Sequence, residues 1–210
     1  GQYDKWNKLH CYIPNSIPLD KEQKPIDYSA QEISIPRLVF ISSGIQPWHG
    51  LDNLIELAEK SVGELQFDLI TGFDVGYLEL PENIKVYPFL EKDEFLEIFK
   101  NAVAGIGSAG LYENGMNEAC VLKLREYLSA GLPVIVPYKD TAFLNQKSPE
   151  WFLELPNEPS SLVNNKEKIM DFVERIRGLR VQTNEVFPYI SSERWEAERV
   201  NFFKQVLKMK

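Results

Sequence analysis

The chain has 210 residues, of which 44% are hydrophobic and 26% charged, and its formal net charge is -8. This composition is typical of a globular protein with one main core. The acidic balance and the lack of a dense run of Lys or Arg argue against a nucleic-acid binder, which needs a basic face. No apolar run approaches the length of a bilayer span, and the first ten residues lack the hydrophobic centre of a secretory signal, so we expect a soluble, cytoplasmic protein.

Residues 1–36 are expected to form a linker or surface arm. Four prolines interrupt this stretch, and its one short apolar cluster is CYIP at Cys11–Pro14. The domain boundaries predicted here are therefore a linker over 1–36 and one folded domain over 37–210.

From Arg37 onward, short β-rich runs alternate with helical patterns. The predicted strands are 38–43, 66–71, 84–87, 103–107, 133–137 and the WFLEL segment at 151–155. The predicted helices are about 50–61, 92–101, 118–130, about 159–177, and a tail helix that begins at Ser191 or Ser192. Alternation of this kind indicates parallel βαβ units, so we predict an α/β fold with a Rossmann-like, doubly wound parallel sheet of about six strands.

The segment EACVLKLREYLSAGLPVIVP, at 118–137, combines two carboxylates with a helix that leads into a buried strand. Gly131 is expected to end the helix, and the start of the helix is expected to lie at the carboxyl edge of the sheet, where ligands of open α/β sheets bind. If Glu118 lies in the first turn, Glu126 lies two turns later, roughly 12 Å along the axis. That separation lets one carboxylate reach a hexose and the other a ribose, which favours a sugar nucleotide as ligand.

Two glycine-bearing turns are candidates for binding phosphates through backbone N–H groups. In SSGIQPWHG, Gly44 lets the backbone approach a phosphate, although an ordinary strand-to-helix turn explains the spacing equally well. In the second turn, Gly115, Met116 and Asn117 precede Glu118, and the alternative is that Asn117 simply caps the helix. The sequence has no GxGxxG pattern, so NAD binding is not predicted.

The only cysteines are Cys11 and Cys120, and the only histidines are His10 and His49. The two thiols are far apart in the sequence, which fits reduced cysteines, and the four side chains share no metal-binding motif. We therefore predict no metal site and no separate cofactor.

The Glu, seven residues, Glu spacing followed by EYLSAGLPVIV resembles the C-terminal, nucleotide-sugar-binding domain of group 1 (family 4-like) retaining glycosyltransferases, which have the two-domain GT-B fold. RLVFISSG with WHGLDNLIELAEK looks like that family's first strand, loop and helix. FDLITG, IKVYPFLEKDEFLEIFKNAVAGIGSA and ISSERWEAERVNFFKQVL resemble later elements, so the similarity covers about Arg37 to the end. CYIPNSIP is similar to the family's crossover between domains. The resemblance implies that an N-terminal, acceptor-binding domain is missing and that the isolated fragment is inactive.

The resemblance also assigns roles to individual residues. Glu118 is the catalytic-site carboxylate that binds sugar hydroxyls, and Glu126 binds the ribose. The positions expected at the nucleotide and diphosphate are Gly44, His49, Gly115, Met116, Asn117, Leu122 and Lys123. The family often has Arg and Lys where this chain has Ile45 and His49, so the loop lacks the usual cation pair. Lys123 is a basic residue that can supply the missing charge.

The resemblance therefore implies transfer of a hexose from a nucleotide-diphosphate sugar to a polysaccharide or glycolipid acceptor. The alternative is a degenerate, non-catalytic domain used for protein association, which the loss of the loop cations favours. An epimerase of similar architecture is disfavoured by the segment around Glu118. The sequence leaves open which base the donor carries and whether the full-length enzyme associates peripherally with a membrane.

Overall fold

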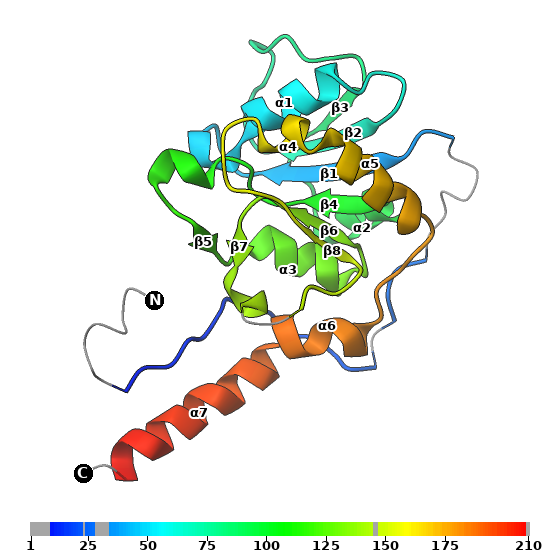
Figure 1. Cartoon of the computed structure of the whole chain (residues 1–210). Coiled ribbons are helices and arrows are strands. Elements are labelled where there is room, and N and C mark those ends of the chain that lie inside the picture. The colour runs from blue at the N-terminus through cyan, green and yellow to red at the C-terminus, as the bar shows by residue number, and fades with distance from the viewer. Residues whose placement is uncertain (1–8, 23, 28–33, 145–146, 209–210) are drawn as a thin grey trace.

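A computed structural model describes residues 9–22, 24–27, 34–144 and 147–208. Its centre is a parallel sheet of six strands in the order β3-β2-β1-β4-β6-β8 (Figure 1). The strands are β1 (Arg37–Ser42), β2 (Gln66–Thr71), β3 (Ile84–Tyr87), β4 (Ala104–Ile106), β6 (Val134–Val136) and β8 (Phe152–Glu154). The predicted number and direction of the strands are confirmed.

Helices cover both faces of the sheet. The helices α1 (Leu51–Glu59), α4 (Ser161–Asn164) and α5 (Lys166–Arg175) pack on one core, and α2 (Lys92–Lys100), α3 (Leu122–Ser129) and α6 (Thr183–Ile190) pack on the other. Neighbouring residues of one strand serve both cores: Leu38 and Phe40 of β1 join the first, and Val39 and Ile41 join the second. Burial on both faces explains the continuous apolar strands and confirms the doubly wound α/β fold.

The chain from 159 to 177 was predicted as one helix, but the structure has two. Asn165 interrupts the helix with φ -113° and ψ 22°, and its side-chain amide donates to the carbonyl of Ser161. Asn competes with helical hydrogen bonds in this way because its short side chain reaches the neighbouring backbone. Helix α6 was not predicted, since Pro188 inside it reads as a break.

The helix predicted from residue 118 begins four residues later, at Leu122. Glu118 and Ala119 instead form β5, which pairs in parallel with β7 (Lys139–Asp140). The backbone N–H of Lys139 also donates to the carbonyl of Asn117, and the side chain of Asn15 donates to the carbonyl of Cys120. These long-range bonds take the place of a first helical turn. The prediction that Glu118 and Glu126 lie on one helix is wrong, and Val121, not Asn117, is the N-cap residue.

The described part of the N-terminal arm runs along the body and reaches the tail helix α7 (Ser192–Lys208). Ile17 exchanges backbone hydrogen bonds with Ile190 and Ser192, which joins the arm to the α6–α7 junction. The hydroxyl of Ser191 accepts from the N–H of Arg194, as expected of a cap. The arm and α7 leave the body on the same side (Figure 1). Within the described ranges, the chain has no helix both long and apolar enough to cross a bilayer.

Candidate functional site

An apolar-walled hollow, called the main cleft here, lies at the point where the strand order reverses. Because β1 and β4 are adjacent while their connections run to opposite sides, their carboxyl ends open a crevice of the kind where α/β proteins bind ligands. The main cleft has a volume of about 650 Å³. Its lining residues are Asn15, Ile41, Ser43, Trp48, His49, Phe89, Phe95, Ser108, Leu111, Asn114, Met116, Ala119, Cys120, Val121, Leu122, Lys123 and Glu126.

Lys123 is the most unusual group in the main cleft. Its ammonium is buried, has no hydrogen-bond partner among the described residues, and lies 4.4 Å from the centre of the Phe40 ring. Burial lowers the pKa of Lys123 to about 7, because the charged form loses its hydration. A buried cation without a carboxylate partner is costly, and an anionic ligand would remove that cost.

His49 reaches the same cleft from the loop after β1. It ends the short 3-10 helix η2 (Pro47–His49), its Nδ1 is buried, and that atom has no partner within the described part of the chain. Burial, and then the nearby Lys123, lower the pKa of His49, so the imidazole is mainly neutral near pH 7. The amide of Ala109 donates to the carbonyl of His49 over 3.0 Å, which fixes the position of this loop.

This loop contact depends on two glycines that the sequence did not single out. Gly50 has φ +76°, and a Cβ there would lie 2.4 Å from the backbone carbon of Ala109. A Cβ on Gly110 would lie 2.1 Å from the carbonyl oxygen of Pro47. Only glycine permits so close an approach of the two loops. The His49 loop and the loop after β4 are therefore packed backbone against backbone.

Glu126 and the beginning of α3 form a further wall of the cleft. Partial burial raises the pKa of the Glu126 carboxyl, whose side chain still faces the opening. Leu122, the first residue of α3, is 54% exposed, and the preceding Val121 offers no side-chain acceptor to the helix N–H groups. Those N–H groups carry the positive end of the helix dipole. The cleft thus combines an acceptor for hydroxyls with donors for an anion.

Helix α3 is held against the sheet by Tyr127. The Tyr127 hydroxyl accepts from the N–H of Ile41 over 2.9 Å, at the carboxyl end of β1. A Cβ on Gly105 would lie 2.4 Å from the Tyr127 ring, so glycine in β4 makes room for this aromatic side chain. Tyr127 therefore sets the distance between α3 and the strands that bound the cleft.

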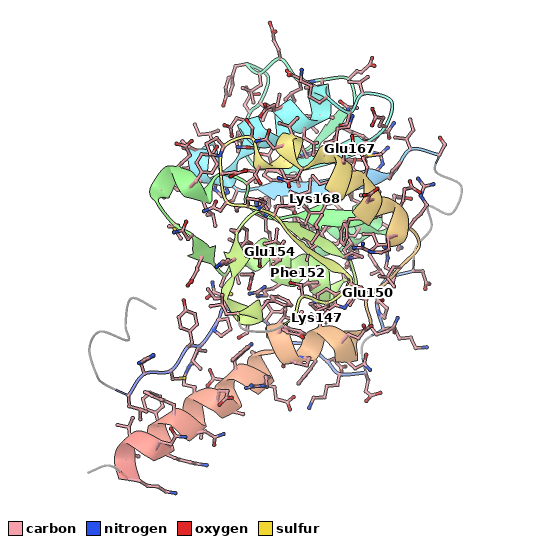
Figure 2. The ribbon with its side chains drawn as sticks, viewed as in Figure 1. Lys147, Glu150, Phe152, Glu154, Glu167 and Lys168 are labelled. Carbon is pink, nitrogen blue, oxygen red and sulfur yellow. The ribbon has the colours of Figure 1, made fainter. Side chains whose placement is uncertain are left out.

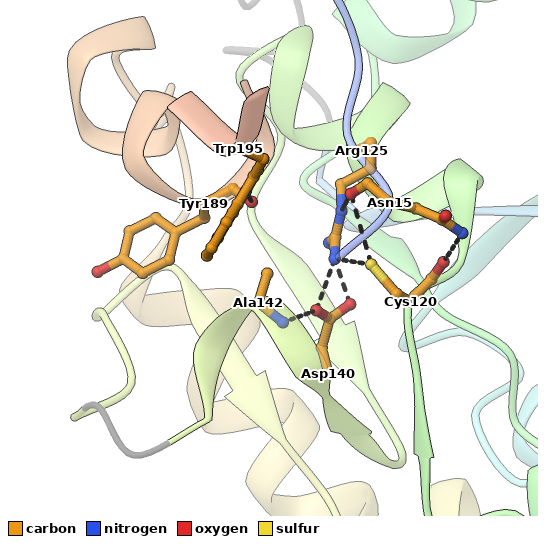
Figure 3. A network of polar contacts seen from close by, with 7 residues as sticks. All are labelled: Asn15, Cys120, Arg125, Asp140, Ala142, Tyr189 and Trp195. Carbon is orange, nitrogen blue, oxygen red and sulfur yellow. Dashed lines mark hydrogen bonds and ion pairs between the residues drawn. The ribbon is translucent and has the colours of Figure 1, made fainter. Parts of the chain in front are cut away.

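A buried ion pair fixes the other side of α3 (Figure 3). Arg125 donates two hydrogen bonds to Asp140, of 3.0 and 2.6 Å, and both side chains are fully buried. Arg125 also donates to the carbonyl of Asn15 and contacts the Cys120 sulfur, while Asp140 accepts from the N–H of Ala142. This network joins the arm, the cleft wall, α3 and β7.

Glu118 does not line the main cleft. Its exposed side chain borders two other hollows. The second cavity, of about 650 Å³, is lined by Asn117, Glu118, Tyr138, Lys139, Glu154, Leu155, Pro156 and Asn157. The third cavity, of about 460 Å³, lies between Glu118, Cys120 and the arm residues from His10 to Asn15. Alternation along β5 places Glu118 and Ala119 on opposite sides of the strand.

The structure thus brings five of the predicted site residues together in the main cleft: His49, Met116, Leu122, Lys123 and Glu126. Asn117 and Glu118 face the second cavity. Gly44 and Gly115 line none of the three hollows. Gly44 accepts from the Ser42 hydroxyl through its carbonyl, and Gly115, with φ +63°, ends the short helix η3 (Leu111–Asn114).

Aromatic side chains make up the cleft walls that sequence reasoning undervalued. Trp48 is 37% exposed and lines the main cleft. Phe89 is 64% exposed there and meets the Phe95 ring edge-on at 5.8 Å. Their position in the sequence, directly after a strand or a glycine loop, is the signal that could have indicated that they line the cleft. In the described residues, no group of three or more His, Cys, Asp or Glu is placed to hold a metal ion.

Comparisons with known proteins place the fold. No family model matches the sequence, and no curated protein matches it. Among solved structures, sucrose-phosphate synthase from Thermosynechococcus elongatus superposes with a TM-score of 0.66 and 14% identity, over 94% of this chain and 53% of that one. The lipopolysaccharide outer core galactosyltransferase WaaB, in its apo form, gives 0.62 and 12%, over 91% of this chain and 54% of that one.

The pneumococcal O-GlcNAc transferase GtfA, solved in complex with UDP and GlcNAc, gives a TM-score of 0.54 and 16% identity, over 86% of this chain and 38% of that one. The chain therefore spans about half the length of the first two structures it resembles. At these identities the likeness establishes the fold, which is the Rossmann-like α/β fold of GT-B glycosyltransferases.

Proposed function

We propose that this chain is the C-terminal, donor-binding domain of a retaining glycosyltransferase that transfers a hexose from a nucleotide-diphosphate sugar to a polysaccharide or glycolipid. The observation that carries the proposal is the unpartnered ammonium of Lys123, buried in a cleft at the sheet's topological switch point. Support also comes from the glycosyltransferases whose fold the chain shares, one of which was solved with UDP and GlcNAc.

The diphosphate is assigned to the part of the main cleft that borders the first turn of α3, which includes Lys123. There the N–H groups of the first helical turn and the Lys123 ammonium would both donate to phosphate oxygens. Ile45, in the place where the family often has Arg, is 64% exposed and has no charge to offer. The cation in this chain would therefore come from the helix and not from the loop. His49 adds a donor when it is protonated.

The nucleoside is assigned to the other part of the cleft. Glu126 would accept hydrogen bonds from the two ribose hydroxyls, because a carboxylate offers two acceptor oxygens. The apolar wall at Phe89 and Phe95 would pack against the base. Glu118 lies in β5, and its side chain is outside the main cleft. It would face the hydroxyls of the transferred sugar.

In the reaction, negative charge accumulates on the departing diphosphate. Donors already aimed at that position stabilise the charge without reorganisation, and Lys123 and the α3 N–H groups would have this role. The acceptor is assigned to an N-terminal domain outside this chain, so the fragment alone is expected to be inactive.

Calorimetric titration of the 210-residue chain with UDP, GDP and ADP tests the proposal. We expect saturable binding of one nucleotide that is lost in Lys123→Met and in Glu126→Ala. Glu174→Gln, on α5 across the sheet, is the matched control and should bind like the unmodified protein. Absence of binding to all three nucleotides would refute the donor-site assignment and favour a degenerate domain used for association.

A further inference from the structure

The amine of Lys123 lies in surroundings that favour its uncharged form. Its Nζ is buried, has no hydrogen-bond partner among the described residues, and lies 4.4 Å from the centre of the Phe40 ring. Burial lowers the pKa of Lys123 to about 7, so a large share of the molecules carries a free amine at neutral pH. The lone pair of a desolvated lysine amine is a nucleophile. Lys123 therefore combines a place in the main cleft with the ability to form a covalent bond.

Lys168 is an exposed lysine with which Lys123 can be compared. It lies on α5, on the opposite face of the sheet from α3, and is labelled in Figure 2. Its ammonium donates to Oδ1 of Asn165 over 2.9 Å, which favours the protonated form. A lysine in water is almost fully protonated at neutral pH, so the free-amine fraction at Lys123 is several hundredfold larger than in such a lysine.

The position of Nζ limits which electrophile can reach it. The main cleft is open to solvent, but the amine is buried against an aromatic ring. A charged electrophile would lose its hydration there, and a bulky one would have to displace the wall. Carbon dioxide is small, carries no charge and adds reversibly to free amines. It is therefore the electrophile that suits this amine best.

His49 is a suitable acceptor for the proton that the amine must release. The titratable residues that line the main cleft are His49, Cys120, Lys123 and Glu126. The buried Nδ1 of His49 has no partner in the described part of the chain, and the positive charge of Lys123 contributes to the lowered pKa of this imidazole. If the end of the Lys123 side chain becomes an anion, that repulsion becomes an attraction, and the imidazolium is favoured. His49 can thus take up the proton and stabilise the product.

We propose that carbon dioxide adds reversibly to Lys123 as a carbamate, which blocks the main cleft to nucleotides. The amine nitrogen forms a bond to the carbon of carbon dioxide, while one C=O electron pair moves onto oxygen and gives a carboxylate. The nitrogen loses one proton to His49, and nothing is oxidised or reduced. A side chain that offers a positive charge to a diphosphate then carries a negative one, which repels it. Carbamate formation is independent of the proposed function, whereas the block of nucleotide binding rests on it.

Carbon-13 NMR of the full chain gives the first test. The protein is labelled with nitrogen-15 lysine and placed in carbon-13 bicarbonate at neutral pH, so that a lysine carbamate gives a carbon signal split by its nitrogen. We expect this signal in the unmodified protein and in Lys168→Arg, and its loss in Lys123→Arg, because a guanidinium stays protonated. Trapping the carbamate with a trialkyloxonium salt, followed by peptide mass spectrometry, identifies the residue that carries it.

Calorimetry gives the second test. The nucleotide that binds is titrated into protein with and without dissolved carbon dioxide, at equal pH and ionic strength. We expect about tenfold weaker binding with carbon dioxide in the unmodified protein and in Lys168→Arg. Whatever affinity Lys123→Arg has should be the same in both solutions. Added nucleotide should in turn reduce the carbamate signal of the unmodified protein, and this competition decides the question even if Lys123→Arg does not fold.

The proposal is overturned if no carbamate forms at Lys123, if Lys168 is trapped to the same extent, or if carbon dioxide leaves nucleotide affinity unchanged. Failure of the donor-site assignment gives a different result. In that case no nucleotide binds, and a carbamate signal that is lost in Lys123→Arg still supports the carbon dioxide site.

Discussion

The buried pair Arg125–Asp140 allows a quantitative test of how the cleft is held together. Asp140→Asn removes the carboxylate charge but keeps an oxygen that can accept from the N–H of Ala142. The guanidinium then remains fully buried, with two charge-assisted hydrogen bonds lost or weakened. Breaking one side of such a pair costs about 3–5 kcal/mol, a large part of the 5–15 kcal/mol that holds a typical domain together.

For a chain of this length, that loss corresponds to a fall in melting temperature of roughly 6–20 °C. Urea unfolding followed by tryptophan fluorescence and circular dichroism gives the free energy of unfolding. The double variant Arg125→Met, Asp140→Asn removes both charges and should recover much of the loss, because a neutral pair needs no desolvation of ions. Glu174→Gln, which breaks an exposed pair with Arg177, should cost less than about 1 kcal/mol.

The reasoning would be refuted in either of two ways. One is an Asp140→Asn variant within about 1 kcal/mol of the unmodified protein, well below the cost of a broken buried pair. The other is a double variant whose loss equals the sum of the two single losses, because partners in direct contact must show a coupling energy.

Three further predictions concern the main cleft. Affinity for a sugar nucleotide, whose diphosphate keeps its charge over this range, should fall as the pH rises from 7 to 9, because Lys123, with a pKa of about 7, must take up a proton to bind. Calorimetry across this pH range measures the slope, and an affinity that stays constant would contradict the assignment of Lys123 to the diphosphate. Gly50→Ala should lower the free energy of unfolding, measured by chemical denaturation, by more than about 2 kcal/mol, because strain at φ +76° adds to a backbone clash. Gly63→Ala, with φ +81° and open space around it, should lower it by only about 1 kcal/mol. Tyr127→Phe leaves the N–H of Ile41 unpaired and should lower the free energy of unfolding by about 1–3 kcal/mol in the same measurement. A variant as stable as the unmodified protein would contradict this geometry.

The sheet and most helices could be predicted from the sequence because their signals are local. A strand buried on both faces must be apolar throughout, as VIV at Val134–Val136 is, and Gly131 with φ +85° marks the end of α3. The tail helix was visible from its serine cap. The break at Asn165 and the presence of α6 were missed, since one depends on a side chain that bonds to the backbone and the other tolerates a proline.

The beginning of α3 could not be predicted, because it is decided by partners far away in the sequence. Residues 118–121 have no strong local preference, and the pairing of β5 with β7 and the amide of Asn15 determine their backbone. As a result, the two glutamates that the motif places eight positions apart face different hollows. The positions of His49, Lys123 and Glu126 in one cleft were anticipated, whereas the backbone contact at Gly50 and Gly110 has no local pattern in the sequence.

Asn15 connects the N-terminal arm to the wall of the main cleft, and this connection determines how the molecule responds to force and to ligands. Its amide holds the carbonyl of Cys120, and its own carbonyl accepts from both Arg125 and the Cys120 thiol. The arm therefore cannot swing without disturbing the wall on which a nucleotide is proposed to lie. Thermodynamic reciprocity makes the coupling two-way: any ligand that favours one position of this wall also restrains the arm, and any load on the arm changes the affinity for that ligand.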